Sequence, residues 1–195
     1  MASVVLTGDT SGSGTITVPA VAGSFTATIG SATGTHYPFT AGTAVASTSG
    51  TSIDFTSIPS WVKRITVMLV GVSTSGTSIP LIRLGTSGGI QTTSYLSGTF
   101  GANSSTLLGW GSSTVGFNMQ NATSAADILH GNAVFTLQDA STNKWTGTWG
   151  LNNSGGSGFN GAGSVTLSGT LTQIRYTTTN GTDTFDAGSI NILYE

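Results

Sequence analysis

The chain is 195 residues long, nearly half of it is threonine, serine or glycine, and only 6% of its residues are charged. Glutamate, lysine, glutamine and arginine, which usually cover exposed helices, are scarce, so the composition favours an all-β protein over a helical one. The net charge of −2, with five scattered basic residues and no cysteine, disfavours nucleic-acid binding and excludes both a disulfide framework and a thiolate metal site.

Apolar residues are frequent enough to build a packed core. They make up 37% of the chain, which argues against a fully disordered polypeptide. No stretch approaches the ~20 consecutive apolar residues of a membrane span, and the first residues lack the basic and long apolar segments of a signal peptide. We therefore expect a soluble protein that does not insert into a membrane.

Residues 1–44 differ in character from the rest of the chain. The segment GTITVPAVAGSFTATIG contains two short alternating runs, Thr15 to Val18 and Ser24 to Ile29, and glycine-rich SATGTHYPFTAG follows it. We interpret 1–44 as an N-terminal β extension that serves as anchor and connector. Residues 45–195 are then expected to form one head domain.

Short alternating runs continue through the head. They are bounded by glycine, serine, asparagine or aspartate and recur roughly every 8–12 residues, the spacing typical of a sandwich or barrel. The predicted strands are 52–58, 62–72, 79–84, 115–120, 132–138, 144–151, 164–179 and 189–194. In 62–72 both faces are partly apolar, which predicts a central strand, and Asn180 with Gly181 predicts a tight turn. The predicted fold is an all-β sandwich or barrel.

Two glycine-containing motifs match catalytic or nucleotide-binding patterns by composition only. Gly85 to Gly89 fits the G-x-S-x-G nucleophile elbow, and Gly156 to Gly161 fits the dinucleotide pattern G-x-G-x-x-G. Both chemistries require a helix directly after the motif. Strand-like sequence follows instead, so we predict a turn at the first motif and a flexible loop at the second.

No arrangement of titratable residues predicts catalysis or metal binding. His36 and His130 are far apart, and although Asp127 precedes His130 by three residues, nothing selects one serine as the third member of a triad. Asp183 and Asp186 are the only close acid pair, and a position beside a turn explains them. We therefore expect no catalytic residue, no cofactor-binding residue, no metal ligand and no enzymatic activity.

The aromatic residues are the candidates for contact with a ligand. Trp145, Gly147 and Trp149 have the same parity in one predicted strand, so the two rings share a face, either in the core, which we favour, or as an exposed platform for sugar rings. Trp110 and Phe159 lie in glycine-rich segments. Each could be an exposed contact, a plug at the end of the sandwich or a subunit contact.

Two stretches of the sequence resemble a known class of domain. ASTSGTSIDFTSIPSWVKRITVMLVGVSTSGTS (46–78) and LTQIRYTTTNGTDTFDAGSINILYE (171–195) resemble a domain found in tail-fibre and other virion proteins of tailed bacteriophages. GTITVPAVAGSFTATIG is similar to the short β-repeats of phage fibre stalks, whereas 85–163 carries no such resemblance. The resemblance implies a jelly-roll-like antiparallel β-sandwich, commonly a homotrimer, without a cofactor.

The resemblance also implies a function and a set of partners. We expect a bacteriophage virion structural protein, either a tail-fibre or receptor-binding subunit for host attachment or, as the alternative, a capsid-decoration, head-fibre or connector protein with a purely architectural role. The expected partners are further copies of the chain, other virion proteins through residues 1–44, and a host surface glycan or outer-membrane receptor. The receptor contacts would come from Trp110, Phe159, Trp145 and Trp149, on a virion assembled in the host cytoplasm.

Overall fold

The computed structural model of this chain describes residues 3–7, 13–17, 39–121 and 124–195. It groups the chain into two compact units, Met1–His36 and Tyr37–Glu195. In the first unit, β1 (Ser3–Thr7) pairs antiparallel with β2 (Ser13–Thr17). The predicted run from Ser24 to Ile29 lies outside the described residues.

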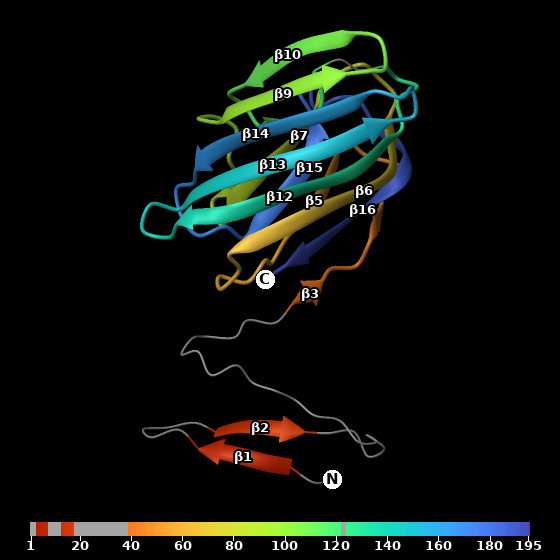
Figure 1. Ribbon diagram of the computed structural model, residues 1–195. Coiled ribbons are helices and arrows are strands. Elements are labelled where there is room, and N and C mark those ends of the chain that lie inside the picture. The colour runs from red at the N-terminus through yellow and green to blue at the C-terminus, as the bar shows by residue number, and fades with distance from the viewer. Residues whose placement is uncertain (1–2, 8–12, 18–38, 122–123) are drawn as a thin grey trace. The chain divides into compact units, whose positions relative to one another are not determined.

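The second unit is an antiparallel β-sandwich, and the described residues contain no helix, so the predicted all-β fold is confirmed (Figure 1). The larger sheet has the order β10-β9-β14-β13-β12-β6-β16-β3, with β4 also pairing with β16. Its strands are β3 (Thr40–Ala41), β4 (Val45–Ala46), β6 (Arg64–Thr74), β9 (Leu96–Ala102), β10 (Leu107–Ser113), β12 (Leu129–Asp139), β13 (Lys144–Asn153), β14 (Gly158–Thr166) and β16 (Phe185–Tyr194).

The smaller sheet packs behind the larger one in the view of Figure 1. Its order is β11-β7-β15-β5, with β8 added beside β7. Its strands are β5 (Ser52–Phe55), β7 (Pro80–Thr86), β8 (Gly89–Ile90), β11 (Phe117–Asn118) and β15 (Gln173–Thr178). The buried apolar side chains of both sheets form one core between them.

The sandwich takes in residues that we predicted to belong to the connector. Thr40 and Ala41 pair with Tyr194 and Leu193 of β16, and the compact unit starts at Tyr37 instead of residue 45. A two-residue strand gives too little alternating pattern to be recognised in sequence. Its pairing partner lies at the opposite end of the chain.

The predicted central strand occupies the middle of the large sheet. β6 lies between β12 and β16, and its side chains alternate as the sequence indicated. Ile65, Val67 and Leu69 are buried, whereas Met68 is half-buried and Val70 is exposed on the other face. The buried face of β6 fixes its register with both neighbours, because a shift by one residue would turn the buried side chains outward.

Large rings in the core lie over glycines of the neighbouring strand. Phe135 is in register with Gly147, and Trp149 is in register with Gly161. A methyl group on either glycine would overlap the ring opposite it. Glycine is therefore required at these strand positions for the space that it leaves, a use of strand glycine for close approach.

Four segments differ from the prediction. We assigned no strand to β9 or β10, and the predicted flexible loop at Gly156 to Gly161 instead contributes its last residues to β14. The run 164–179 contains two strands, β14 in the large sheet and β15 in the small one. Glycine is a turn signal in sequence, but here it marks positions where a ring covers the strand.

The turn at Asn180 and Gly181 is confirmed, although it does not close a hairpin. Gly181 has φ 67°, and the side-chain oxygen of Asn180 accepts hydrogen bonds from the backbone N–H groups of Thr182 (3.0 Å) and Asp183 (3.2 Å). The turn leads from β15 to β16, which belong to different sheets. It therefore connects the two sheets of the sandwich.

Replacing Gly161 tests the packing of rings over glycine. Gly161→Ala should lower the free energy of unfolding by about 1–3 kcal/mol, because the added methyl displaces the buried indole of Trp149. Gly158→Ala is the matched control on the same strand, since no atom of the described residues, apart from its chain neighbours, lies within 4 Å of the methyl it would add. Urea unfolding measures both, and equal losses would show that the ring does not fill this space.

Two buried tyrosines give a second test. The backbone N–H of Leu84 donates to the Tyr95 hydroxyl (2.9 Å), which donates to the Gln91 carbonyl (3.1 Å). The buried Tyr176 hydroxyl has no hydrogen-bond partner among the described residues. Tyr95→Phe should therefore destabilise the protein by about 1–3 kcal/mol, and Tyr176→Phe should leave stability unchanged or increase it.

The pH dependence of stability supplies a further readout for the same pair of variants. Burial raises the pKa of both phenols above the ordinary tyrosine value of about 10. The resulting stabilisation is complete below that value and is lost as the pH rises toward the pKa of the folded state. Tyr176→Phe should reduce the alkaline loss of stability in urea titrations, and an unchanged loss would contradict the burial of its hydroxyl.

Candidate functional site

Three of the four aromatic residues that we singled out belong to the core. Trp145, Trp149 and Phe159 are 2%, 4% and 1% exposed, so none of them is available as a surface contact in the folded sandwich. The correction is greatest for Phe159, which we placed in a loop. It lies in β14, and its ring covers Gly101 of β9.

Trp110 is the fourth candidate, and it is 71% exposed. It lies in β10, not in a loop, and is in register with Phe100 of β9, which is 38% exposed on the same face. A methyl group on Gly98 would overlap the six-membered ring of the Trp110 indole. The six-membered ring therefore lies against β9 at Gly98, and most of the Trp110 side chain is open to solvent.

Side-chain amides hold the strand that carries Trp110. β10 is the edge strand of the large sheet, and edge carbonyls are otherwise free to pair with another chain. Asn121 donates its amide N–H groups to the carbonyls of Leu108 (3.0 Å) and Gly109 (2.6 Å), and Asn118 donates to the carbonyl of Gly111 (3.2 Å). These bonds cover part of the edge and fix the position of Trp110.

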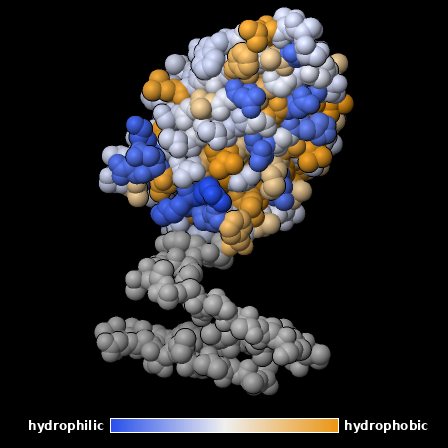
Figure 2. All heavy atoms as spheres, in the orientation of Figure 1, coloured by the Kyte–Doolittle hydropathy of each residue, from blue (hydrophilic) through white to orange (hydrophobic). Residues whose placement is uncertain are grey.

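The outer face of the large sheet is nearly free of charge around Trp110 and Phe100. The outward-facing residues of β9, β12, β13 and β14 in the central part of this face are Gly98, Phe100, Asn132, Val134, Thr148, Gly150, Asn160 and Ala162. Figure 2 shows hydrophilic and hydrophobic residues interspersed over this face. Its bonding groups are hydroxyls, amides and apolar surface.

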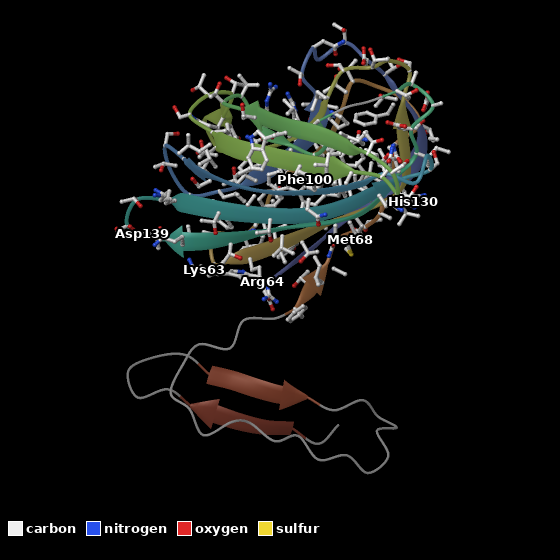
Figure 3. All side chains as sticks on the ribbon, turned by 45° about the horizontal axis from the view of Figure 1, so that its top comes forward. Lys63, Arg64, Met68, Phe100, His130 and Asp139 are labelled. Atoms are coloured by element: carbon white, nitrogen blue, oxygen red, sulfur yellow. The ribbon has the colours of Figure 1, made fainter. Side chains whose placement is uncertain are left out.

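The charged residues of this side gather toward one end. Figure 3 shows Lys63, Arg64 and Asp139 near that end, with Phe100 away from them on β9. Arg64 forms an ion pair with Glu195. The outer face of the small sheet is different, because there Arg175 forms a bidentate ion pair with Asp54 (2.7 and 2.8 Å).

The histidine and the acid that could have formed a catalytic pair have separate structural roles. His130 Nδ1 accepts a hydrogen bond from the backbone N–H of Gly71 (3.2 Å). Asp127 accepts from the Ser124 N–H (3.0 Å) and the Asn153 amide (3.0 Å). His36 lies outside the described residues, and those residues contain no group of acidic, histidine or cysteine side chains that could hold a metal ion.

The two acids of the close pair, Asp183 and Asp186, also accept hydrogen bonds from other residues. Asp183 accepts hydrogen bonds from the Asn180 amide (2.7 Å) and the Ser78 N–H (2.9 Å), which hold its pKa below the ordinary value. Asp186 instead accepts from the Ser73 hydroxyl. A general acid for glycoside hydrolysis needs a raised pKa, and the shift at Asp183 has the opposite direction.

A hollow of about 320 Å³ is a second feature near β10. Its lining is uncharged and consists of Ile79, Leu81, Gly111, Ser112, Ser113, Thr114, Val115, Asn118, Gln120, Asn121 and Thr179. The amide N–H groups of Asn118 and Asn121 are engaged with β10, and the Asn118 oxygen accepts from Ser97. The Asn121 side-chain oxygen has no hydrogen-bond partner among the described residues, but it is buried. The exposed indole with its neutral surroundings is the stronger candidate.

No family model, curated protein or solved structure matches this chain. The resemblance to phage virion proteins therefore stays a prediction from the sequence. In the part of the chain that the structure describes, no helix is long and apolar enough to cross a membrane.

Fluorescence quenching tests the exposure of Trp110. We expect acrylamide to quench the emission of Trp110 most strongly, because Trp145 and Trp149 are almost completely buried and Trp61, the fourth tryptophan, is half-buried. Trp110→Phe should remove most of the accessible emission, whereas the control Trp149→Phe should lower total emission and leave the accessible component in place. An accessible component that survives Trp110→Phe in full would show that this indole is covered.

Proposed function

We propose that this chain is an adhesive structural protein of a bacteriophage particle and that its sandwich attaches to a neutral glycan on the host surface. The observation that carries the adhesive role is the exposed indole of Trp110 over Gly98, on a sheet face without central charges. The flat apolar side of a sugar ring can cover an indole, while its hydroxyl groups reach amides and hydroxyls beside it. The phage particle as the location rests on the sequence resemblance.

The chemistry of the face favours a neutral ligand over a charged one. Its central part offers amides such as Asn132 and Asn160 and hydroxyls such as Thr148. Hydrogen bonds between neutral groups contribute only about 0.5–1.5 kcal/mol each, and bonds to charged groups contribute more. An anionic or cationic polymer would lose hydration at this face without gaining an ionic partner.

Such contacts are weak individually, so the proposed function depends on several copies acting together. A homotrimer, expected from the resemblance, would present the site three times, and several fibres on one particle would repeat it. Linked sites raise the overall affinity by a factor of roughly 10²–10⁴ without any new contact. Adhesion by avidity requires no reactive group.

The rigidity of the site supports binding by weak contacts. Trp110 lies on the backbone of one strand, and amides from Asn118 and Asn121 hold the strand that carries it. Each mobile side chain that becomes fixed on binding costs about 0.5–1.5 kcal/mol. A ring that is already held in place avoids part of this cost.

Cell binding tests this function. Labelled protein should attach to a susceptible bacterial strain, and Trp110→Ala should weaken attachment by about tenfold or more, as expected for an aromatic hot spot. Leu96→Ala is the matched control, because Leu96 is 73% exposed on the adjacent strand β9. Free neutral oligosaccharide should compete with the cells, and flow cytometry measures each effect.

Two results would contradict the proposal. Equal loss with Leu96→Ala would indicate general hydrophobic adhesion instead of a site at Trp110. Absence of attachment in every oligomeric state would favour the architectural alternative, a capsid-decoration or connector protein anchored through residues 1–44.

A further inference from the structure

We propose that a neutral oligosaccharide lies across the strands of the large sheet, along one line of residues that starts at Trp110. The inference rests on the proposed adhesive function and specifies where and in which direction the glycan binds. The line, which we call the cross-strand row, consists of Trp110, Phe100, Asn160, Gly150, Asn132 and Met68.

The register of five strand pairs places these residues in one line. Each member is the direct partner of the next across the sheet, from β10 through β9, β14, β13 and β12 to β6. Adjacent strands are about 4.8 Å apart, so the row extends over about 24 Å. Figure 3 shows Phe100 and Met68 on the same face, with β12 and β13 between them.

The chemistry along the row suits a linear chain of sugar rings. Its first two residues are aromatic and exposed, the amides of Asn160 and Asn132 follow, and Met68 adds a polarisable apolar group at the far end. Amides both donate and accept, as do sugar hydroxyls. Apolar contacts at both ends and hydrogen bonds in the middle would align the glycan along the row.

Gly150 leaves space in the middle of the row. If a methyl group were added there, the only atom of the described residues within 4 Å, apart from its chain neighbours, would be the side-chain oxygen of Asn160, at 3.4 Å. The other row members carry side chains that project from the sheet, so the surface is lower at Gly150. A sugar ring can approach the backbone there without displacing a side chain.

The surroundings of the row favour a neutral glycan over a charged polymer or a peptide strand. Arg64 lies on β6 four residues from Met68, which is about 13 Å along a strand, and it is already paired with Glu195. A peptide strand would need free backbone groups, and the row crosses strands that are paired on both sides from β9 to β6. A neutral glycan requires neither charge nor a free sheet edge.

The test adds a side chain at Gly150, where the row is lowest, and removes no side chain of the row. Gly150→Val should weaken binding of neutral glucose or N-acetylglucosamine oligosaccharides by about tenfold, because a branched side chain blocks the middle of the row. Ser164→Val is the matched control, since it places the same branched side chain on the same face four residues along β14 from Asn160. Isothermal titration calorimetry or NMR titration measures the affinities.

Ligand length gives an independent readout. In a series from disaccharide to hexasaccharide, affinity for the wild type should rise with each unit that reaches further along the row. With Gly150→Val this dependence should stop at the short ligands that contact only Trp110 and Phe100. Circular dichroism should confirm an intact fold, and Asn132→Ala replaces Gly150→Val if that variant does not fold.

The outcomes separate this inference from the proposed function. If Gly150→Val binds like the wild type while Trp110→Ala does not bind, the glycan lies elsewhere around β10, for example in the uncharged hollow, and the row is wrong. If the wild type binds none of the series but still attaches to cells through Trp110, the row is again wrong and adhesion stands. If it does neither, both proposals fail.

Discussion

The structure depends on one packing constraint, which is that large rings lie over glycine on the neighbouring strand. Strands of a sheet are only about 4.8 Å apart, so a ring that lies across its neighbour needs a position without a side chain. Inside the sandwich, Trp149 over Gly161 and Phe135 over Gly147 fill the core in this way. On the outside, Trp110 at Gly98 uses the same arrangement and leaves most of its side chain exposed to solvent. Core packing and the candidate site therefore have one physical basis.

Two of the few carboxylates, Asp183 and Asp139, are engaged in hydrogen bonds at turns. Asp183 accepts hydrogen bonds at the turn that leads from β15 to β16, and Asp139 does so from Ser141 and Thr142 after β12. Both carboxylates have pKa values below the ordinary value because they accept these bonds. A charged carboxylate engaged with a turn suits neither a general acid nor a free ligand for a metal. The proposed function accordingly uses shape, neutral hydrogen bonds and the number of copies.

Side-chain hydrogen bonds at the β10 edge of the large sheet leave the sheet face as the surface for binding. An open edge strand can pair with any extended chain, but amides from Asn118 and Asn121 already occupy carbonyls of β10. At the opposite end of the sheet, β3 and β4 are only two residues each. The broad outer face, which is uncharged in its central part, remains open, and its in-register residues can contact a ligand that runs across the strands. Rigid pairing on both sides of β9, β14, β13 and β12 keeps these residues in line.

The sequence by itself determined the fold class, the central position of β6 and the turn at Asn180, because composition, alternation and turn chemistry are local properties. It did not reveal β9, β10 or the start of β14, since a glycine beneath a ring has the same sequence signal as a glycine in a turn. Nor could it separate Trp110 from Phe159, which both occur among glycines. Only strand register decides that Phe159 faces Gly101 in the core while Trp110 lies outside over Gly98. Register arises from pairing between segments far apart in the chain, so the candidate site belongs to the tertiary structure.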